Sequence, residues 1–342
     1  MIQIERVVGA DGAGLSIVVQ GPLKKETDER GFSTVSVMES ARRFYPAAEI
    51  IYSGWSGENS PNELYGLSDK VVLSTDPGPV QIFVTKDGVP HFENINRQIA
   101  STVAGLKAAT NAWAIKMRSD TLIVRNQLSA WTELQQQKAR RVTLFKLPLI
   151  ASSKFTRLLY HERGDFHGCL GHVSDLFFFG LKNDLLHYWN GPFLPQSQDV
   201  NDFNGSARME QILGIRCLVN CGMLPVGSRI THTQARRVGD LDGARWADLL
   251  EANFIVLEEA GLGVRHPARF HRMDLSRFAY ESEYSISAWR GRLGYRKYIW
   301  FYCVKFGVFL VYQLKSAFQR LVGNRHYGKL TSLVYSLYGR RR

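Results

Sequence analysis

The chain has 342 residues, which is long enough for one large α/β domain with an appendage or for two domains. Its 22% charged and 12% aromatic residues are typical of a globular protein and exclude a disordered chain. The net charge of +12 resides in the C-terminal tail: residues 289–342 hold 12 of the 43 Lys and Arg and no Asp or Glu, so the remaining 31 balance the 31 acidic residues. A neutral body of this kind argues against nucleic acid as a partner.

The first part of the sequence alternates strand-like with helix-like patterns. Short apolar runs predict strands, and Gly21-Pro22 closes the first of them, while apolar residues spaced three and four apart predict helices. Around Ile99 one apolar stripe should face the core, with Asn94 as the helix N-cap. We expect strands at 15–20, 48–55, 69–76 and 112–117, and helices at 33–45 and 94–110.

The second part of the sequence is less regular. Further strands are expected at 142–148 and 174–182, and helices at 207–219 and 243–254. The alternation predicts a mostly parallel sheet covered by helices on both faces, with ligand sites at the carboxyl ends of the strands. Residues 190–207 are loop-like and are expected to form a mobile lid or an acceptor loop.

The strand expected at 112–117 carries charge where a buried strand should lack it. Alternation places Lys116 and Arg118 on one face near the carboxyl end, and Asp120 follows one step beyond. Two cations suit a diphosphate, and a carboxylate suits a divalent metal or a sugar hydroxyl. An ion pair between Arg118 and Asp120 at the rim of the sheet is the structural alternative.

Arg97 is expected in the first turn of its helix, where the helix dipole disfavours a cation. An anion bound at this helix N-terminus would explain the placement, with Asn94, Asn96 and Gln98 as further polar contacts. The alternative is an ordinary polar helix start on the surface. Together with Lys116 and Arg118, Arg97 favours the anion site.

Six segments of residues 15–220 read, in chain order, VVQGPL, RRFYPAAEIIYSGW, STDPG, NINRQIASTVAGL, KMRSD and SDLFFFG. In this order they resemble the WavE family of lipopolysaccharide-synthesis proteins, and the run from DPG through NRQI to RSD is the most specific. The resemblance implies a GT-A-like fold, with a mostly parallel Rossmann-like sheet and flanking helices. It also implies a nucleotide-sugar-dependent glycosyltransferase of the hexosyltransferase type, acting in synthesis of the lipopolysaccharide core, O-antigen or another bacterial surface polysaccharide.

Carried over to matching positions, the resemblance assigns residues to donor binding. Gln20 and Gly21 border the nucleoside pocket, and Asp76 contacts the nucleoside unless it only caps its turn. Asp120 becomes the metal or donor-phosphate residue. The motif at 118–120 has Arg118 in place of the first Asp of the usual Asp-x-Asp. Two alternatives therefore remain for the diphosphate charge: a divalent metal (Mn²⁺ or Mg²⁺) neutralises it, or Arg118 does. The expected donor-binding residues are Gln20, Gly21, Asp76, Asn96, Arg97, Lys116, Arg118 and Asp120.

An inverting transfer needs a carboxylate that takes the proton of the acceptor hydroxyl. Glu210, at the start of a predicted helix, stands where the resemblance to GT-A enzymes places the base, and Asp175 is its competitor. The structural alternative for Glu210 is a carboxylate favoured by the helix dipole. Asp165, His167 and His172 lie in a Gly-rich stretch that we expect to be a loop, contacting the acceptor or a metal or simply solvated.

Residues 286–342 form a basic, aromatic tail that we place apart from a GT-A-like domain at 1–285. The apolar run at 298–314, broken by Lys305 and flanked by Arg and Lys, predicts a helix lying on an anionic membrane surface. A membrane span and a final helix packed on the body are the alternatives. The N-terminus shows no signal pattern and the four cysteines fit a reducing compartment, so we expect a peripheral protein at the cytoplasmic face of the bacterial inner membrane.

The sequence thus predicts a glycosyltransferase that moves a sugar from a nucleotide-sugar donor to a lipid-linked saccharide acceptor. A sugar nucleotidylyltransferase shares a phosphate site at strand ends, but the Gly-rich loop it needs is missing after the first strand, where Lys24 and Lys25 stand. The other rival is a non-catalytic membrane-associated scaffold with a degenerate GT-A fold.

Overall fold

The computed structural model describes residues 8–24, 32–58, 62–84, 87–138, 140, 142–162, 165–194, 209–230, 237–270 and 281–283. In this part of the chain the largest sheet has seven strands, in the order β14 (Phe254–Leu257), β8 (Leu149–Ser152), β11 (Phe177–Leu181), β6 (Trp113–Arg118), β1 (Leu15–Gln20), β2 (Glu49–Trp55) and β3 (Lys70–Ser74). Neighbouring strands are parallel except at β11, which runs opposite to β6 and β8. The expected mostly parallel α/β sheet is confirmed.

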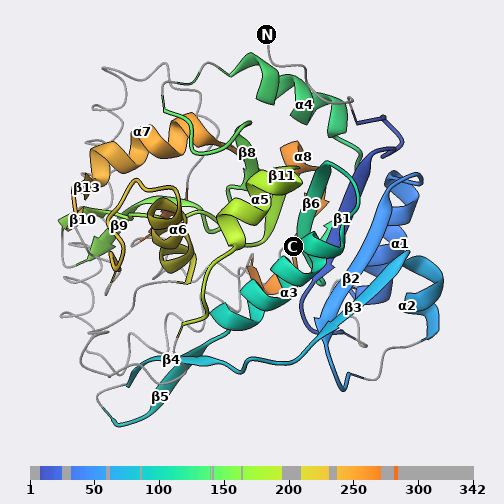
Figure 1. Cartoon of the computed structure of the whole chain (residues 1–342), viewed down its shortest axis with the longest axis horizontal. Coiled ribbons are helices and arrows are strands. Elements are labelled where there is room, and N and C mark those ends of the chain that lie inside the picture. Colours follow the sequence, from blue (N-terminus) through green and yellow to red (C-terminus); the bar gives the residue numbers. More distant parts are fainter. Residues whose placement is uncertain are drawn as a thin grey trace, which may run out of the picture.

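Helices flank this sheet (Figure 1). Each face of the sheet has its own hydrophobic core. The helices are α1 (Thr34–Phe44), α2 (Asn62–Leu67), α3 (Ile95–Ala108), α4 (Leu128–Gln137), α5 (Lys182–Trp189), α6 (Met209–Asn220), α7 (Gly243–Asn253) and α8 (Glu259–Leu262). Along β6 the side chains alternate as predicted. Trp113, Ile115 and Met117 belong to the core that contains α1 and α4 residues, and Ala114 belongs to the core that contains α3 and α5 residues.

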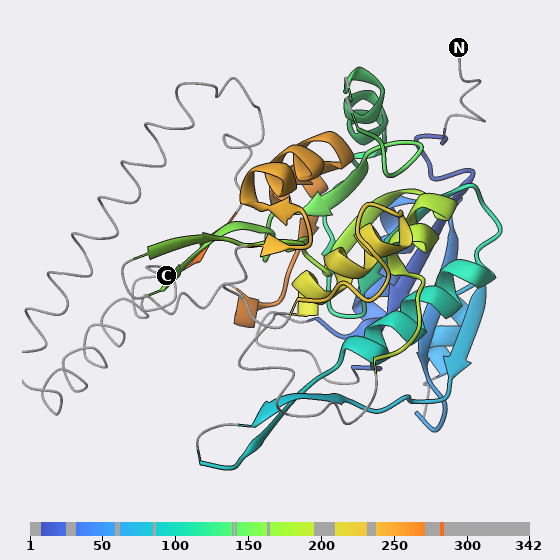
Figure 2. The ribbon, with the colours of Figure 1, turned by 60° about the vertical axis from the view of Figure 1, so that its left-hand side comes forward.

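Smaller strands lie outside the main sheet. The hairpin of β4 (Val80–Val84) and β5 (Pro90–Glu93) projects from the body in both views (Figures 1 and 2). The remaining strands are β7 (Leu122–Ile123), β9 (Arg157–Glu162), β10 (Asp165–Gly168), β12 (Arg237–Val238), β13 (Leu241–Asp242), β15 (Val264–Arg265) and β16 (Glu281–Glu283). The prediction that the Gly-rich stretch is a loop is therefore partly wrong, because Asp165–Gly168 forms a strand that pairs with β9.

Local sequence explains how the first strand and helix begin and end. β1 is buried along its whole length, and the chain turns at Gly21 with φ of 121°, a conformation that favours glycine. Ser33 then caps α1. Its Oγ accepts a hydrogen bond of 3.1 Å from the Ser36 amide, and the Ser36 Oγ accepts one of 3.0 Å from the Ser33 amide. Asn94 occupies the N-cap position of α3 as predicted, but its side chain makes no capping hydrogen bond.

The strand expected at 142–148 is wrong, because the strand of this region, β8, begins at Leu149. Side chains bind the backbone amides that a strand would have paired. Asn253 Oδ1 accepts from the Leu144 amide at 2.7 Å, and the Asp184 carboxylate accepts from the amides of Lys146 and Leu147 at 3.0 and 3.1 Å. These contacts hold the segment as bends outside the sheet.

The tail at 286–342 and residues 195–207 of the predicted lid or acceptor loop lie outside the described residues. Within the described ranges, no helix combines the length and apolar character that a membrane crossing requires.

Candidate functional site

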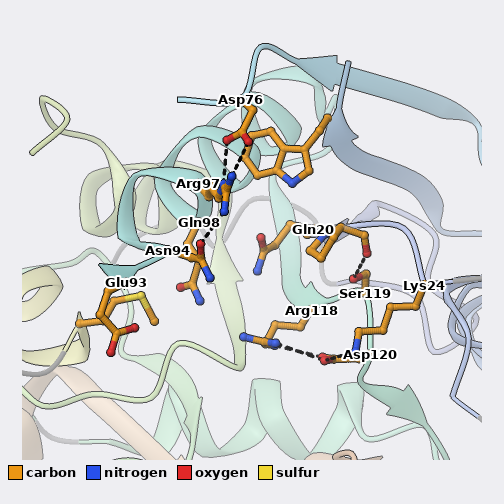
Figure 3. A pocket seen from close by; sticks show the side chains of 14 residues that line it. Gln20, Lys24, Asp76, Glu93, Asn94, Arg97, Gln98, Arg118, Ser119 and Asp120 are labelled. Atoms are coloured by element: carbon orange, nitrogen blue, oxygen red, sulfur yellow. Dashed lines mark hydrogen bonds and ion pairs between the residues drawn. The ribbon is translucent and has the colours of Figure 1, made fainter. Parts of the chain in front are cut away.

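A cavity of about 460 Å³ opens at the carboxyl ends of β1, β2 and β6 (Figure 3). The chain passes from β1 outward through β2 and β3 before it returns to β6 on the other side of β1. The cavity therefore lies at the point where the strand order reverses, which is the usual ligand site of open α/β sheets. Six predicted donor-binding residues line it: Gln20, Gly21, Asp76, Arg97, Arg118 and Asp120.

Asp120 is the centre of a cationic cluster at one side of the cavity. Asp120 as a whole residue is 1% exposed, and its carboxylate accepts hydrogen bonds from Arg118 Nε at 3.0 Å and Nη2 at 3.2 Å, and another from Arg269 Nη2. Lys24 Nζ lies 3.7 Å from Oδ2. Burial opposes ionisation of Asp120, but Arg118, Arg269 and Lys24 outweigh burial and hold its pKa well below the usual range. The ion pair between Arg118 and Asp120, considered from the sequence as the structural alternative to a ligand site, is therefore present.

Phe270 orders the two arginines of this cluster. Its ring lies 5.4 Å from the guanidinium carbon of Arg118 and 4.7 Å from that of Arg269. Phe155 packs edge-on against the same ring, with 5.3 Å between the centroids. Phe270 and Arg269 belong to the 3₁₀ helix Ala268–Phe270 (η2), about 150 residues after Arg118, so the sequence motif gave no signal that they belong here.

Arg97 and Asp76 form a second ion pair on the cavity lining (Figure 3). Arg97 Nε and Nη2 donate to the two carboxylate oxygens of Asp76 at 2.8 and 2.6 Å, and Nη1 donates to Asn94 Oδ1 at 2.9 Å. The hydrogen bonds from Arg97 hold the pKa of Asp76 below its usual value. Asp76 Oδ1 also accepts from the Gly78 amide at 2.9 Å, which is the turn cap considered as its alternative role.

Gln20 and Gly21 line the cavity directly after β1. Gln20 is 2% exposed, and its Oε1 accepts a hydrogen bond of 2.8 Å from the Ser101 hydroxyl on α3. At Gly21 an added Cβ would come within 3.1 Å of Ser119 Oγ. The backbone can therefore run close to the strand-end motif that carries Arg118 and Asp120.

Lys116 and Asn96, expected to bind the donor, do not line this cavity. The Lys116 side chain is fully buried, donates to the backbone carbonyl of Asp175 and lies 4.4 Å above the Trp189 ring. Burial lowers the pKa of this ammonium to about 7. Asn96 exchanges two hydrogen bonds with the backbone of Leu194, at 2.7 and 2.8 Å, and so fastens α3 to the chain after α5.

The two candidate bases belong to one buried cluster next to the cavity. Gln98, a lining residue, donates from Nε2 to Asp175 Oδ2 at 2.6 Å, and Arg118 Nη1 lies 3.8 Å from the same oxygen. Glu210 lies in the first turn of α6 beside the lining residue Met209, and burial together with the charge of Asp175 raises its pKa to about 7. Asp175 and Glu210 do not themselves line the cavity.

His172 belongs to the same buried cluster as Asp175 and Glu210, so the alternative that it is a solvated loop residue is wrong. Its ring is fully buried, with Nε2 3.2 Å from Arg157 Nη1 and 4.0 Å from Glu210 Oε2. Asp165 and His167 belong to β10, and their side chains lie outside what the structure describes.

Sequence reasoning missed four kinds of lining residue. Trp55 adds an aromatic face, Glu93 adds a carboxylate from β5, Met209 adds an apolar contact, and Lys24 adds a cation. Trp55 ends a predicted strand and Glu93 ends an unpredicted hairpin, and no charge or spacing pattern in the sequence marks either residue as a ligand contact. Lys24 was noted only as part of a loop that the nucleotidylyltransferase alternative requires.

The residues present do not fit the divalent metal that the GT-A resemblance implies. A metal site of this kind needs several oxygen ligands with unshared lone pairs. Asp120 instead offers its oxygens to three cationic side chains, and the described residues contain no group of three or more His, Cys, Asp or Glu arranged to hold a metal ion.

The fold and the cavity define an open α/β protein with a cavity lined by Lys24, Arg97 and Arg118 at the carboxyl edge of its sheet. A protein-family model described as WavE lipopolysaccharide synthesis matches residues 15–316, so the chain belongs to the WavE family. The match confirms the resemblance, extends past the expected domain boundary at 285, and implies a role in lipopolysaccharide synthesis. A search of curated proteins found no match.

Proposed function

We propose that the protein is a nucleotide-sugar-dependent glycosyltransferase of GT-A-like fold. The observation that carries this proposal is the cation-lined cavity at the switch point of the sheet, in a chain of a lipopolysaccharide-synthesis family. A cavity of about 460 Å³ lies in the size range of small-ligand sites. Lys24, Arg97 and Arg118 on its lining suit a ligand that carries phosphate.

The residues that line the cavity support one orientation of the bound donor, with the nucleoside near Trp55 and the diphosphate near Arg118. Trp55 offers a face on which a nucleobase can stack, near Gln20 and Gly21, and Asp76 offers carboxylate oxygens to ribose hydroxyls. The diphosphate would then lie toward Arg118. Gln98 Oε1 is buried without a hydrogen-bond partner among the described residues, so it is suited to accept a hydrogen bond from a hydroxyl of the transferred sugar.

Glu210 is the proposed general base. A base works best with a pKa near the operating pH, and burial gives Glu210 a pKa of about 7. The acceptor hydroxyl attacks the anomeric carbon, its proton passes to Glu210, and the bond from that carbon to the diphosphate oxygen breaks. Asp175, held by Gln98, maintains the charge that raises the pKa of Glu210.

The acceptor is proposed to be a lipid-linked saccharide, bound while the protein lies on the cytoplasmic face of the inner membrane. Support comes from the family's role in lipopolysaccharide synthesis and from the basic, aromatic composition of residues 286–342. Asp165 and His167 remain proposed acceptor contacts.

A panel of nucleotide sugars and free nucleotides tests the proposal on the full chain. The apparent stability should rise by about 2.7 kcal/mol at a hundredfold excess of the preferred donor over its dissociation constant. Release of nucleoside diphosphate with the acceptor present supports transfer, and release of pyrophosphate would instead indicate a nucleotidylyltransferase. A folded protein that no nucleotide stabilises would be the scaffold, and the proposed activity would be wrong.

A further inference from the structure

We propose that the donor diphosphate is bound by Lys24, Arg118 and Arg269 without a divalent metal, and that Asp120 is the positioning residue that holds these cations in place. This inference rests on the proposed function and assigns the chemistry of its phosphate site. It also adds Arg269, from the 3₁₀ helix η2, to that site; Arg269 does not itself line the cavity but donates a hydrogen bond to the lining residue Asp120.

The three cations are fixed by contacts from separate parts of the fold. Arg118 ends β6 and makes two hydrogen bonds to Asp120. The backbone of Lys24 exchanges hydrogen bonds with Thr34 at the start of α1, at 2.9 and 3.0 Å, and this pairing sets where its side chain begins. Arg269 is stacked over the ring of Phe270, which also contacts Arg118.

The cations remain accessible although their shared carboxylate is not. The side chains of Lys24, Arg118 and Arg269 are 31%, 25% and 38% exposed, while that of Asp120 is 2% exposed. An incoming anion therefore meets N–H groups, and the carboxylate lies behind them. Guanidinium groups present paired donors that match phosphate oxygens.

The charges of this cluster match a diphosphate that links a nucleoside to a sugar. Three cations and one carboxylate leave two positive charges, and such a diphosphate carries two negative ones. A divalent ion supplies the same two charges in a metal-dependent enzyme, so here the cluster replaces it. A metal at Asp120 would have to displace Arg118 and Arg269 and would bring like charges together.

Calorimetric titration of the full chain with pyrophosphate and with UDP, GDP, CDP and ADP tests the inference, with EDTA and with Mn²⁺. The variants are Arg269→Gln and Asp120→Asn. Arg245→Gln is the matched control, because Arg245 also pairs with an aspartate and is 42% exposed, but it lies on α7 and its partner is Asp240, which does not line the cavity, whereas the partner of Arg269 is the lining residue Asp120.

We expect binding with EDTA that weakens as salt is added, since charge pairs at this exposure are screened. Arg269→Gln should weaken binding by about tenfold to a hundredfold, the range for losing a hydrogen bond to a charged group. Arg245→Gln should leave the affinity unchanged. Asp120→Asn should keep binding in EDTA, because the cations remain, although transfer falls as they lose their fixed positions.

Binding that occurs only with Mn²⁺ and disappears in Asp120→Asn would overturn the inference and leave the proposed transferase intact. A folded wild-type chain that binds none of the five ligands in either condition would overturn both. If Asp120→Asn fails to fold, the metal dependence of the wild type and the comparison of Arg269→Gln with Arg245→Gln still decide the question.

Discussion

Gln98 Nε2 donates a hydrogen bond of 2.6 Å to Asp175 Oδ2, and this contact joins the cavity lining to the buried carboxylates beside it. Gln98 comes from the first turns of α3, and Asp175 comes just before β11. Asp175 in turn raises the pKa of Glu210 on α6. The state of the proposed base is therefore set by residues from three elements that converge at one edge of the sheet.

Glu210→Gln should lower the transfer rate by about 10² to 10⁴-fold, because a general base contributes about that much. In the wild type the rate should rise with pH through about 7, since Glu210 accepts a proton only when ionised and its pKa is raised to about 7. The variant should lose this rise. Initial rates measured on both sides of pH 7 at saturating donor provide the test.

Donor affinity should be unchanged in Glu210→Gln, since Glu210 does not line the cavity. Glu133→Gln, an exposed change on α4, is the matched control and should leave rate and pH profile as in the wild type. An unaltered pH profile in Glu210→Gln would exclude Glu210 as the base and turn attention to Asp175.

Asp76→Asn should weaken donor binding with little effect on stability. Asn keeps the oxygen that caps the Gly78 amide but loses the charge that pairs with Arg97. The pair is 34% and 40% exposed, and such pairs contribute about 0 to 1 kcal/mol. Thermal melts and nucleotide titrations of the same preparation separate the two effects. A large loss of stability with normal affinity would assign Asp76 to the turn alone.

The sequence was most informative where a residue's role depends on its near neighbours. The first strand, Leu15–Gln20, was predicted with its exact limits, because a continuous apolar run and Gly21-Pro22 mark both ends. The helix stripe around Ile99 and the alternating faces of β6 were also predicted correctly, because each depends on a short local period, about 3.6 residues in a helix and 2 in a strand.

Long-range contacts account for most of what the sequence did not reveal. Strand β8 was displaced from its expected position because Asp184 and Asn253 bind the amides before it. Lys116 was expected at the ligand, but Trp189 and the Asp175 carbonyl receive its ammonium instead. Arg269 meets Asp120 across almost 150 residues, and no local pattern announces such a pairing.

Cys221 should react with iodoacetamide at mildly acidic pH. The hydrogen bond with Cys217, at 3.9 Å between the sulfur atoms, outweighs burial and, with the charge of His187, lowers the pKa of Cys221 to about 6. Peptide mapping should show labelling that rises through about pH 6 at Cys221, whereas Cys169 and Cys217 are buried and should stay unlabelled. Cys221 itself is only partly buried, so the reagent can reach it. Labelling that begins near the usual thiol pKa would contradict this expectation.

Removal of residues 289–342 should release the protein from anionic vesicles. These residues carry 12 Lys and Arg and no acidic group, and each basic residue near an anionic surface contributes about 1 kcal/mol. Flotation with anionic and with neutral vesicles measures the effect, and the full chain should bind the anionic vesicles more. A truncated chain that still floats with anionic vesicles would place the membrane contact elsewhere.

Lys116→Met should leave nucleotide affinity unchanged and should stabilise the protein most below about pH 7. The folded state lowers the Lys116 pKa from its ordinary value to about 7 through burial, so it favours the neutral amine. The stability that comes from keeping this amine neutral is fully present above the unfolded pKa of about 10.4 and is lost as the pH falls through about 7. Methionine fills similar space without a charge, so its advantage over lysine should grow as the pH falls across that window.

Thermal melts of wild type and Lys116→Met at several pH values measure this difference, and nucleotide titration is done on the same samples. If Lys116→Met instead lost nucleotide binding while still melting cooperatively, Lys116 would contact the donor as its position in the sequence first suggested.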